Sequence, residues 1–417
     1  MSLGLILPDS LPARHRRRLE FAFRVACGWY GQEAVFLTDE NADFPFLRYG
    51  EDLPALYAPL TRPPDSVPVH GTDEAGRVDH LGELFSWISG EVEQSQSPDQ
   101  WGRKLFATSF QKKLGLDPLR APAVEAAIAL FPQTAFPRVR MVAPTHDVDF
   151  LPVTLPQVLV RGSKNSLILL RARDPAGSLA VLGRTLSALL GQTPFRPLSE
   201  WAKAEARAGF RGSYYFLFER GHKKDGNYSP EQALKAARFL SSLGAEVGVH
   251  GSWHSLDGEQ GLAEEYLRCP DPLGGRQHYL RHGPENRLLQ SLENAGAEYD
   301  STLAWPDHPG FRLGSSLPFP LYHLDEDRAG SVVQIPLAVM DVSLTGDNPE
   351  LAKKLFSRDD SGAFAILWHD TVMSGMQHPR RAASLFWELQ ELSDHSWLPA
   401  CEIAEQFRRE FERAGIW

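Results

Sequence analysis

Two short stretches of this 417-residue chain combine residues that could hold a metal ion and move protons. Asp147 and Asp149 follow an apolar run, and on an extended strand residues two apart point to the same side, so both carboxylates can enter one pocket. His250 and His254 follow another apolar run, and at a spacing of four on a helical turn they can share one cation. Two imidazoles and a carboxylate on a divalent ion, with a second carboxylate free to take a proton from water, would equip a metal-dependent hydrolase. Helix caps or core histidines are the structural alternatives.

The elements that would position these residues alternate between strand and helix from residue 136 onward. Strand-like apolar runs precede both motifs and recur at 212–218, 332–336 and 363–368, and a helical pattern at 230–243 is followed by Gly244. This alternation predicts parallel strands with helices outside. Polar motifs directly after strands lie where such folds gather their active sites. An α/β barrel and a doubly wound sheet both fit the order.

Residues 1–135 are predicted to form a small mixed α/β N-terminal accessory domain, and residues 136–417 the catalytic domain. Helical spacing of apolar residues indicates helices at about 13–27, 79–91 and 101–116. No residue of this first part suggests chemistry, and its role is not indicated. The first helix should point its arginines outward: Arg14, Arg16, Arg17 and Arg18.

The composition bounds the class of protein. A formal net charge of -10 argues against a general nucleic-acid binder, which usually has a basic face. No run approaches the roughly 20 apolar residues of a membrane-spanning helix, and the N-terminus lacks a basic leader before its apolar residues. Cys27, Cys269 and Cys401 form no CxxC pair, so a disulfide framework is not expected. A cytoplasmic protein is the expectation, and the oligomeric state is not indicated.

One segment, residues 151–200, differs from this acidic background. It is rich in arginine and lysine, has few carboxylates, and contains apolar runs at 166–170 and 179–190. Such a segment could contact a membrane surface peripherally or meet an anionic substrate. The alternative is one or two barrel helices that cover the core and expose solvated arginines.

Residues 145–149 read Thr-His-Asp-Val-Asp, and residues 250–254 read His-Gly-Ser-Trp-His. These motifs resemble the first two of the NodB-homology polysaccharide deacetylases, carbohydrate esterase family 4, although the family has Ser or Thr in place of Gly251. The resemblance implies a deformed (β/α) barrel. It also implies Asp147 as the general base and a Zn²⁺-type ion held by Asp149, His250 and His254.

A third motif follows at residues 276–279, Arg-Gln-His-Tyr. The family has Arg-x-Pro-Tyr there, so His278 stands where Pro is expected. On this match Arg276 orients the base, with Arg281 as the competing assignment. Tyr279, or a backbone N–H near it, would help to stabilise the developing oxyanion. Tyr279 and Arg281 are therefore expected to contact the substrate.

The two remaining motifs also occur, in the family's order. Asp300 with Trp305 resembles the fourth motif, and Leu367-Trp368-His369 the fifth. The resemblance implies that His369 protonates the departing nitrogen, while Asp300 fixes its tautomer and supports its cationic form. Trp305 would line the substrate pocket, with core packing as the equal alternative. The whole pattern is similar to a subgroup with an extra N-terminal domain.

The function expected from these residues is removal of acetyl groups from N-acetylated sugars of a polysaccharide or glycan precursor. One alternative is a metal-dependent hydrolase of another C–N amide, as in allantoinase-like relatives. Another is a non-catalytic glycan-binding or assembly protein that keeps the metal site. No GxSxG elbow, phosphate-binding GxxxxGK[ST] loop or GxGxxG fingerprint occurs. Serine hydrolase, NTPase and dinucleotide enzyme are therefore disfavoured.

Overall fold

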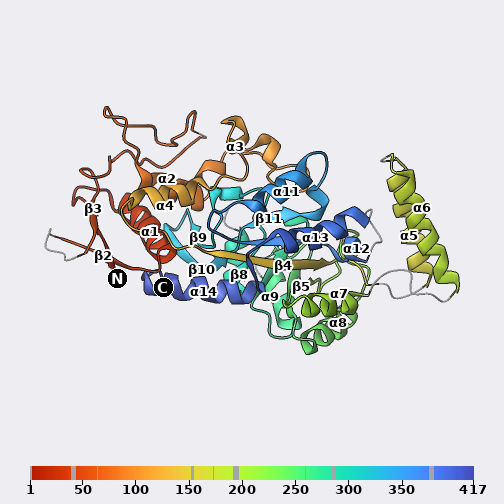
Figure 1. Ribbon diagram of the computed structural model, residues 1–417. Helices are drawn as coiled ribbons and strands as arrows, with labels where there is room; N and C mark the ends of the chain where they lie inside the picture. Colours follow the sequence, from red (N-terminus) through yellow and green to blue (C-terminus); the bar gives the residue numbers. More distant parts are fainter. Residues whose placement is uncertain are drawn as a thin grey trace.

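A curled sheet of ten strands runs through the middle of the molecule, flanked by helices (Figure 1). The computed structural model describes residues 2–38, 44–62, 64–151, 155–171, 173–190, 197–258, 260–283, 287–374 and 380–417. Along the sheet the strands are β11 (Leu337–Met340), β12 (Gly362–Leu367), β4 (Arg140–Val148), β5 (Ser213–Phe216), β6 (Glu246–Gly251), β7 (Gly274–Gln277), β8 (Tyr299–Asp300), β10 (Arg328–Gln334) and β9 (Phe319–His323). A short strand, β13 (Ser396–Trp397), pairs with β4.

The strand directions agree with the expected βα alternation. Neighbouring strands are parallel from β11 to β10, and only β9 runs antiparallel to its neighbour. Among the described residues no pairing joins β11 to β9, so the sheet forms a curled half-barrel. This arrangement fits a deformed barrel.

Helices follow most of the parallel strands. They are α7 (Leu198–Arg207), α8 (Pro230–Ser242), α9 (Gly261–Arg268), α10 (Arg287–Asn294), α11 (Asn348–Ser357), α12 (Asp370–Met373), α13 (Arg380–Leu392) and α14 (Ala400–Arg413). The helix predicted before Gly244 is confirmed as α8. It begins with a capping box formed by Ser229 and Gln232, and Gly244 follows it with φ +83°.

The N-terminal part has a three-stranded parallel sheet of its own, in the order β2 (Glu33–Phe36), β1 (Ser2–Ile6), β3 (Phe46–Arg48). Its main helices are α1 (Ala13–Trp29), α2 (His80–Ile88) and α4 (Pro122–Leu130). The first two confirm predicted helices. The third predicted helix, over residues 101–116, is wrong: a 3-10 turn (Phe106–Thr108) and the short α3 (Phe110–Lys113) form there instead of one continuous helix. The Asp99 side chain accepts hydrogen bonds from the backbone N–H groups of Trp101 and Arg103. These bonds hold the first residues of the predicted helix in a turn.

Arg18 joins this N-terminal part to the half-barrel. Its guanidinium is 2% exposed and forms ion pairs with Glu91 and with Asp327, which precedes β10. The prediction that this arginine faces solvent is therefore wrong, because its turn of α1 packs against the barrel. Phe21 of α1 also contacts Tyr322 of β9, with ring centroids 4.6 Å apart. One hydrophobic core includes both parts, and the division near residue 135 remains a prediction.

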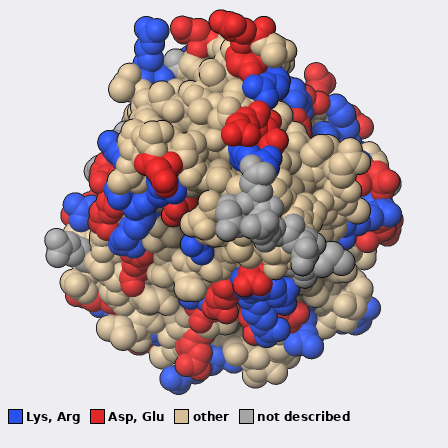
Figure 2. All heavy atoms as spheres, turned by 90° about the vertical axis from the view of Figure 1, so that its left-hand side faces the viewer, with Lys and Arg blue, Asp and Glu red and all other residues tan. Residues whose placement is uncertain are grey.

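The outer face of the N-terminal part carries mixed charge. Figure 2 shows basic and acidic side chains next to one another on this face. The N-terminal part contains exposed ion pairs, such as Arg77 with Asp73 and Arg120 with Glu125. This face is therefore no single-sign docking surface in the part of the chain that the structure describes.

A helical hairpin, α5 (Leu155–Arg171) and α6 (Pro175–Ser187), lies at the end of the molecule opposite the N-terminal strands (Figure 1). A short 3-10 turn, Ala188–Leu190, continues α6. No helix in the described ranges has both the length and the apolar character needed to cross a bilayer.

Candidate metal centre and proton-transfer site

The register of the central strands brings the chemistry-bearing residues to one edge of the sheet. Asp147 on β4 pairs with Tyr215 on β5, and His250 on β6 pairs with Arg276 on β7. A cavity of about 780 Å³ opens at this edge, and Asp147, Asp149 and His369 line it. The carboxyl ends of parallel strands thus form the site, as the sequence predicts.

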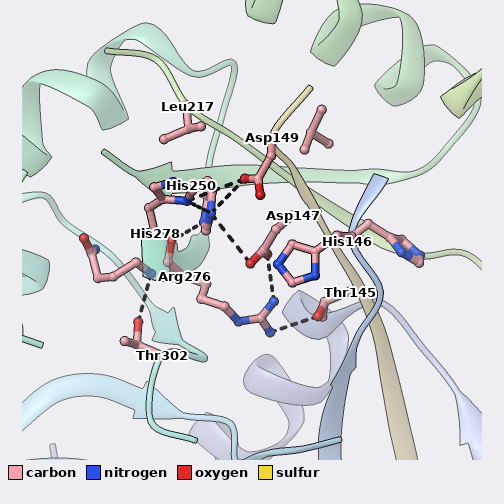
Figure 3. A network of polar contacts seen from close by, with 12 residues as sticks. Thr145, His146, Asp147, Asp149, Leu217, His250, Arg276, His278 and Thr302 are labelled. Atoms are coloured by element: carbon pink, nitrogen blue, oxygen red, sulfur yellow. Dashed lines mark hydrogen bonds and ion pairs between the residues drawn. The ribbon is translucent and has the colours of Figure 1, made fainter. Parts of the chain in front are cut away.

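Three side chains converge at the base of this cavity (Figure 3). Asp149 Oδ1 lies 3.5 Å from His250 Nε2 and 3.5 Å from His278 Nδ1. The two ring nitrogens are 2.8 Å apart. Asp149 Oδ1 is buried and forms no hydrogen bond with any part of the chain that the structure describes.

Backbone carbonyls fix how both rings face this point. His250 Nδ1 lies 2.9 Å from the carbonyl oxygen of Arg276, and His278 Nε2 lies 2.9 Å from that of Lys224. A carbonyl oxygen accepts only, so these ring nitrogens carry protons, and when both rings are neutral the two facing nitrogens present lone pairs to each other. Lone pairs at 2.8 Å repel unless a cation or a proton lies between them. Two imidazole nitrogens and an unpartnered carboxylate oxygen are the donor set of a Zn²⁺-type site.

The charge state of Asp149 suits a ligand. Burial by itself raises the pKa of this carboxyl, but the imidazoles of His278 and His250 outweigh burial and hold it far below its usual range. The carboxylate is therefore ionised. Asp149, His250 and His278 are the residues that fit a divalent ion.

His254 does not join this cluster. β6 continues through Gly251, and a turn follows, so the two histidines are not on one helical face. The His254 side chain is 50% exposed and pairs with Asp257. His278 occupies the position expected for His254 in the candidate ligand set.

Asp147 lies beside the cluster and is held by Arg276. Arg276 Nη1 donates to Asp147 Oδ1 at 2.9 Å, and its Nη2 donates to Thr145 Oγ1 and Ser301 Oγ (Figure 3). Burial by itself raises the pKa of Asp147, but His250 and Arg276 lower it below its usual value. An ionised, oriented carboxylate in a cavity is suited to accept a proton.

Arg281, the competing candidate for the arginine that orients Asp147, contacts Trp253 instead. Its guanidinium stacks 4.3 Å from the centre of the Trp253 ring and donates to the Trp253 carbonyl oxygen. Arg276 is therefore the arginine that contacts Asp147.

His369 lines the same cavity, with a partner that differs from the expected one. His369 Nδ1 lies 2.7 Å from Asp341 Oδ1, and its backbone N–H donates to Asp341 Oδ2. Asp300 instead accepts from the backbone N–H and the hydroxyl of Thr302. Burial by itself lowers the pKa of His369, but Asp341 and two further carboxylates raise it to about 10. The ring is therefore cationic near neutral pH, and its Nε2 can donate a proton.

Of the two aromatic residues expected to contact the substrate, Tyr279 lines the cavity and Trp305 does not. Tyr279 lines the cavity and adopts a left-handed backbone conformation with φ 59°. Trp305 is buried, 2% exposed, and packs against Phe106 and the Arg312 guanidinium. It does not line the cavity, so the core-packing alternative describes it.

The N-terminal part contributes to the rim of the site, which the sequence does not indicate. Trp101 lies 6.0 Å from Tyr279 and 6.0 Å from Trp253, ring centre to ring centre. Lys224 Nζ lies 4.5 Å from the centre of the Trp101 ring, and Arg103 lines the cavity. Trp101 and Trp253 thus lie beside Tyr279 and Lys224, which line the cavity.

Three residues at the site have no role in the sequence-based interpretation. His278 has a sequence signal, since histidine stands where the resemblance expects proline. Asp370 directly follows His369, and its Oδ1 accepts from the Asp149 N–H at 2.9 Å. Burial and the Asp149 carboxylate raise the pKa of Asp370 to about 8. No sequence pattern points to Asp341, because only the fold brings the end of β11 beside β12.

Comparisons with known proteins leave the family open. No family model matches the chain, and no curated protein is significantly similar to it. Among solved structures the chain is similar to the crystal structure of Puue allantoinase, with 15% sequence identity and a TM-score of 0.38 over 64% of this chain and 90% of that one. A likeness this distant identifies no activity, so the function has to be inferred from the site itself.

Proposed function

We propose that this protein is a metal-dependent hydrolase that cleaves an amide C–N bond. The observation that carries the proposal is the lone-pair arrangement of His250 Nε2 and His278 Nδ1 around the unpartnered Asp149 Oδ1. An ionised Asp147 and a cationic His369 line the same cavity. A metal site with a separate base and a separate acid can carry out metal-assisted hydrolysis of an amide.

The chain's own residues supply the proton transfers. A divalent ion bound by Asp149, His250 and His278 would supply Lewis acidity, which eases deprotonation of water and polarises an acyl oxygen. Asp147 accepts the proton from the water whose oxygen attacks the acyl carbon. Arg276 keeps that carboxylate ionised and oriented. His369 Nε2 donates its proton to the nitrogen as the C–N bond breaks, so a carboxylic acid and an amine leave.

An N-acetylated sugar of a glycan precursor is one candidate substrate. Five motifs in the order of the polysaccharide deacetylases and the aromatic rim of Trp101, Trp253 and Tyr279 support it, because aromatic faces present large, rigid apolar surfaces. A Zn²⁺-type ion is the proposed cofactor.

One observation favours a second candidate, an amide other than an N-acetyl group. The ligand set contains His278 in place of His254, so the metal centre departs from the deacetylase pattern. Gly251 is a second difference from the deacetylase pattern, which has Ser or Thr at this position. A Cβ on Gly251 would lie 2.2 Å from Gln277 Oε1, so a larger residue does not fit beside Gln277. The second and third motifs therefore both differ from the deacetylase pattern at residues close to the metal centre.

The test is a substrate panel on zinc-loaded protein. N-acetylated mono- and oligosaccharides would be assayed for acetate release, and cyclic and linear amides for ring opening or amine release. Asp147→Asn should keep bound zinc and lose turnover by about 100- to 10,000-fold. Hydrolysis by the wild type and Asp147→Asn at equal rates, or by neither on any substrate, would contradict the proposal.

A further inference from the structure

The α5–α6 hairpin exposes an unusual number of large apolar side chains. Val160 and Leu179 are each 71% exposed, and Leu190 is 79% exposed. In the described ranges, more than half of all exposed large apolar side chains lie on this hairpin and its terminal turn: Leu155, Val160, Leu167, Ile168, Leu170, Leu179, Leu186, Leu189 and Leu190. Exposed apolar surface concentrated on one element marks an interaction site.

The interior of the hairpin combines small and polar residues with three buried apolar side chains, Val158, Leu169 and Val181. Ser166 Oγ lies 2.9 Å from the Ser178 carbonyl oxygen and 2.8 Å from Ser178 Oγ, across the two helices. A Cβ on Gly162 would lie 1.9 Å from Thr185 Oγ1, so the helices approach closely there. Together with Asn165, these side chains are buried while leucines face outward. A close approach of helices through small and polar residues, with leucines on the outside, is found where helices pack beside lipid.

The charge of the hairpin is opposite to that of the whole chain. Residues 155–190 contain five cations, Arg161, Lys164, Arg171, Arg173 and Arg184, and one carboxylate, Asp174. The chain as a whole has a formal charge of -10. Basic residues beside exposed leucines are the composition of helices that lie in the interface of an anionic membrane.

Helix α5 also forms part of the wall of the candidate active site. Arg161, Lys164 and Ile168 line the cavity. Val160 lines it as well, so two of the exposed apolar side chains of the hairpin, Val160 and Ile168, adjoin the site. The exposed apolar surface and the site therefore share helix α5.

We propose that the α5–α6 hairpin docks this protein on the surface of an anionic lipid bilayer. The helices lie in the interface, since none among the described residues is long and apolar enough to cross a bilayer. A second copy of the chain fits this surface less well, because two hairpins of net positive charge would face each other. Docking through α5 brings the cavity close to the membrane.

The proposal is tested with the full-length protein and lipid vesicles. Vesicles of phosphatidylglycerol and phosphatidylcholine in equal parts should sediment the protein, and vesicles of phosphatidylcholine alone should leave it in solution. Added salt should weaken the binding. Arg171→Gln/Arg173→Gln should weaken it by about fivefold per charge removed, whereas Arg409→Gln/Arg413→Gln on α14 should not.

A matched pair of variants tests the apolar contribution. Leu179→Ser/Leu186→Ser removes two leucines from one side of α6 and should weaken binding by at least about tenfold. Leu267→Ser/Phe239→Ser removes two exposed apolar side chains from α9 and α8 and should bind like the wild type. All of these positions are exposed, so the folds should survive, which circular dichroism would check. Asp149→Asn should bind vesicles like the wild type, so membrane docking and the proposed hydrolase activity can fail independently.

Two results would overturn the proposal. The first is wild-type protein that stays in solution with anionic vesicles, or hairpin variants that sediment as well as the wild type. The second is a concentration-dependent dimer, measured by analytical ultracentrifugation, that Leu179→Ser/Leu186→Ser dissociates. That dimer would make a second copy the occupant of this face.

Discussion

His250 Nε2 and His278 Nδ1 lie 2.8 Å apart, each on a ring whose other nitrogen is bonded to a backbone carbonyl. The carbonyls come from β7 and from the loop after β5, so the fold fixes the orientation of both rings before any ion binds. Preorganised ligands of this kind lose little freedom on binding. This arrangement explains why the candidate metal centre contains His278 and not His254.

The first prediction distinguishes the two histidines. His278→Ala should weaken zinc binding by at least about 100-fold, because it removes a ligand with its supporting carbonyl contact. His254→Ala should leave the affinity within about twofold, since its side chain pairs with Asp257 at the surface. Competition with a chromophoric chelator measures both affinities. The reverse ranking would restore His254 to the ligand set.

The second prediction concerns the partner of His369. Asp341→Asn should lower turnover by about 100- to 10,000-fold while zinc stays bound, because the imidazole loses the carboxylate that orients it. Asp341 also raises the pKa of His369, which stands at about 10, so its neutralisation lowers this pKa. A general acid works only while protonated, so the alkaline limb of the kcat/KM profile should move to lower pH.

Asp300→Asn is the control for this prediction. Asp300 bonds to Thr302 and not to His369, so its substitution should leave the alkaline limb where it is in the wild type. A shift of that limb in Asp300→Asn and none in Asp341→Asn would contradict the assignment.

The third prediction tests the junction between the N-terminal part and the half-barrel. Arg18→Met leaves the buried carboxylate of Glu91 without the cation that pairs with it, although Asp327 keeps its ion pair with Arg14, and should lower the free energy of unfolding by about 3–5 kcal/mol. Arg17→Met removes an arginine that is 53% exposed and should change it by no more than about 0.5 kcal/mol. Urea denaturation followed by tryptophan fluorescence measures both. Equal changes in the free energy of unfolding for the two variants would contradict the prediction that the buried ion pairs of Arg18 stabilise the fold.

The fourth prediction concerns pH and Glu83 on α2. Burial raises the pKa of this carboxyl from 4.5 to about 7, although the His70 N–H donates to it. The folded state therefore binds its proton more tightly than the unfolded state. This contribution to stability is complete below about pH 4.5 and is lost as the pH rises through about 7.

Glu83→Gln removes the titration and keeps a hydrogen-bond acceptor for His70. At pH 8 the variant should be more stable than the wild type by roughly 1–3 kcal/mol, and the difference should shrink as the pH falls toward 5. Thermal unfolding across this pH range measures the difference. A difference that does not change with pH would contradict the raised pKa.

The sequence by itself indicated the features that depend on neighbouring residues. Apolar runs and helical spacing predict parallel strands with helices between them, and α8 begins and ends where its capping residues place it. Asp147 near the end of β4 and Asp149 directly after it both line one cavity, as the period of two of an extended chain predicts. The polar motifs after strands then predict one site at the carboxyl ends, where the cavity lies.

Only the tertiary structure decided which residues from different strands meet. The place where β6 ends puts His254 in a turn at the surface, and the pairing of β7 with β6 puts His278 beside His250 instead. Asp341 reaches His369 because β11 pairs with β12, and Arg18 is buried because α1 packs on the strand pair β9–β10. These contacts join residues far apart in the chain. Their distances depend on strand order, register and packing, which local spacing does not encode.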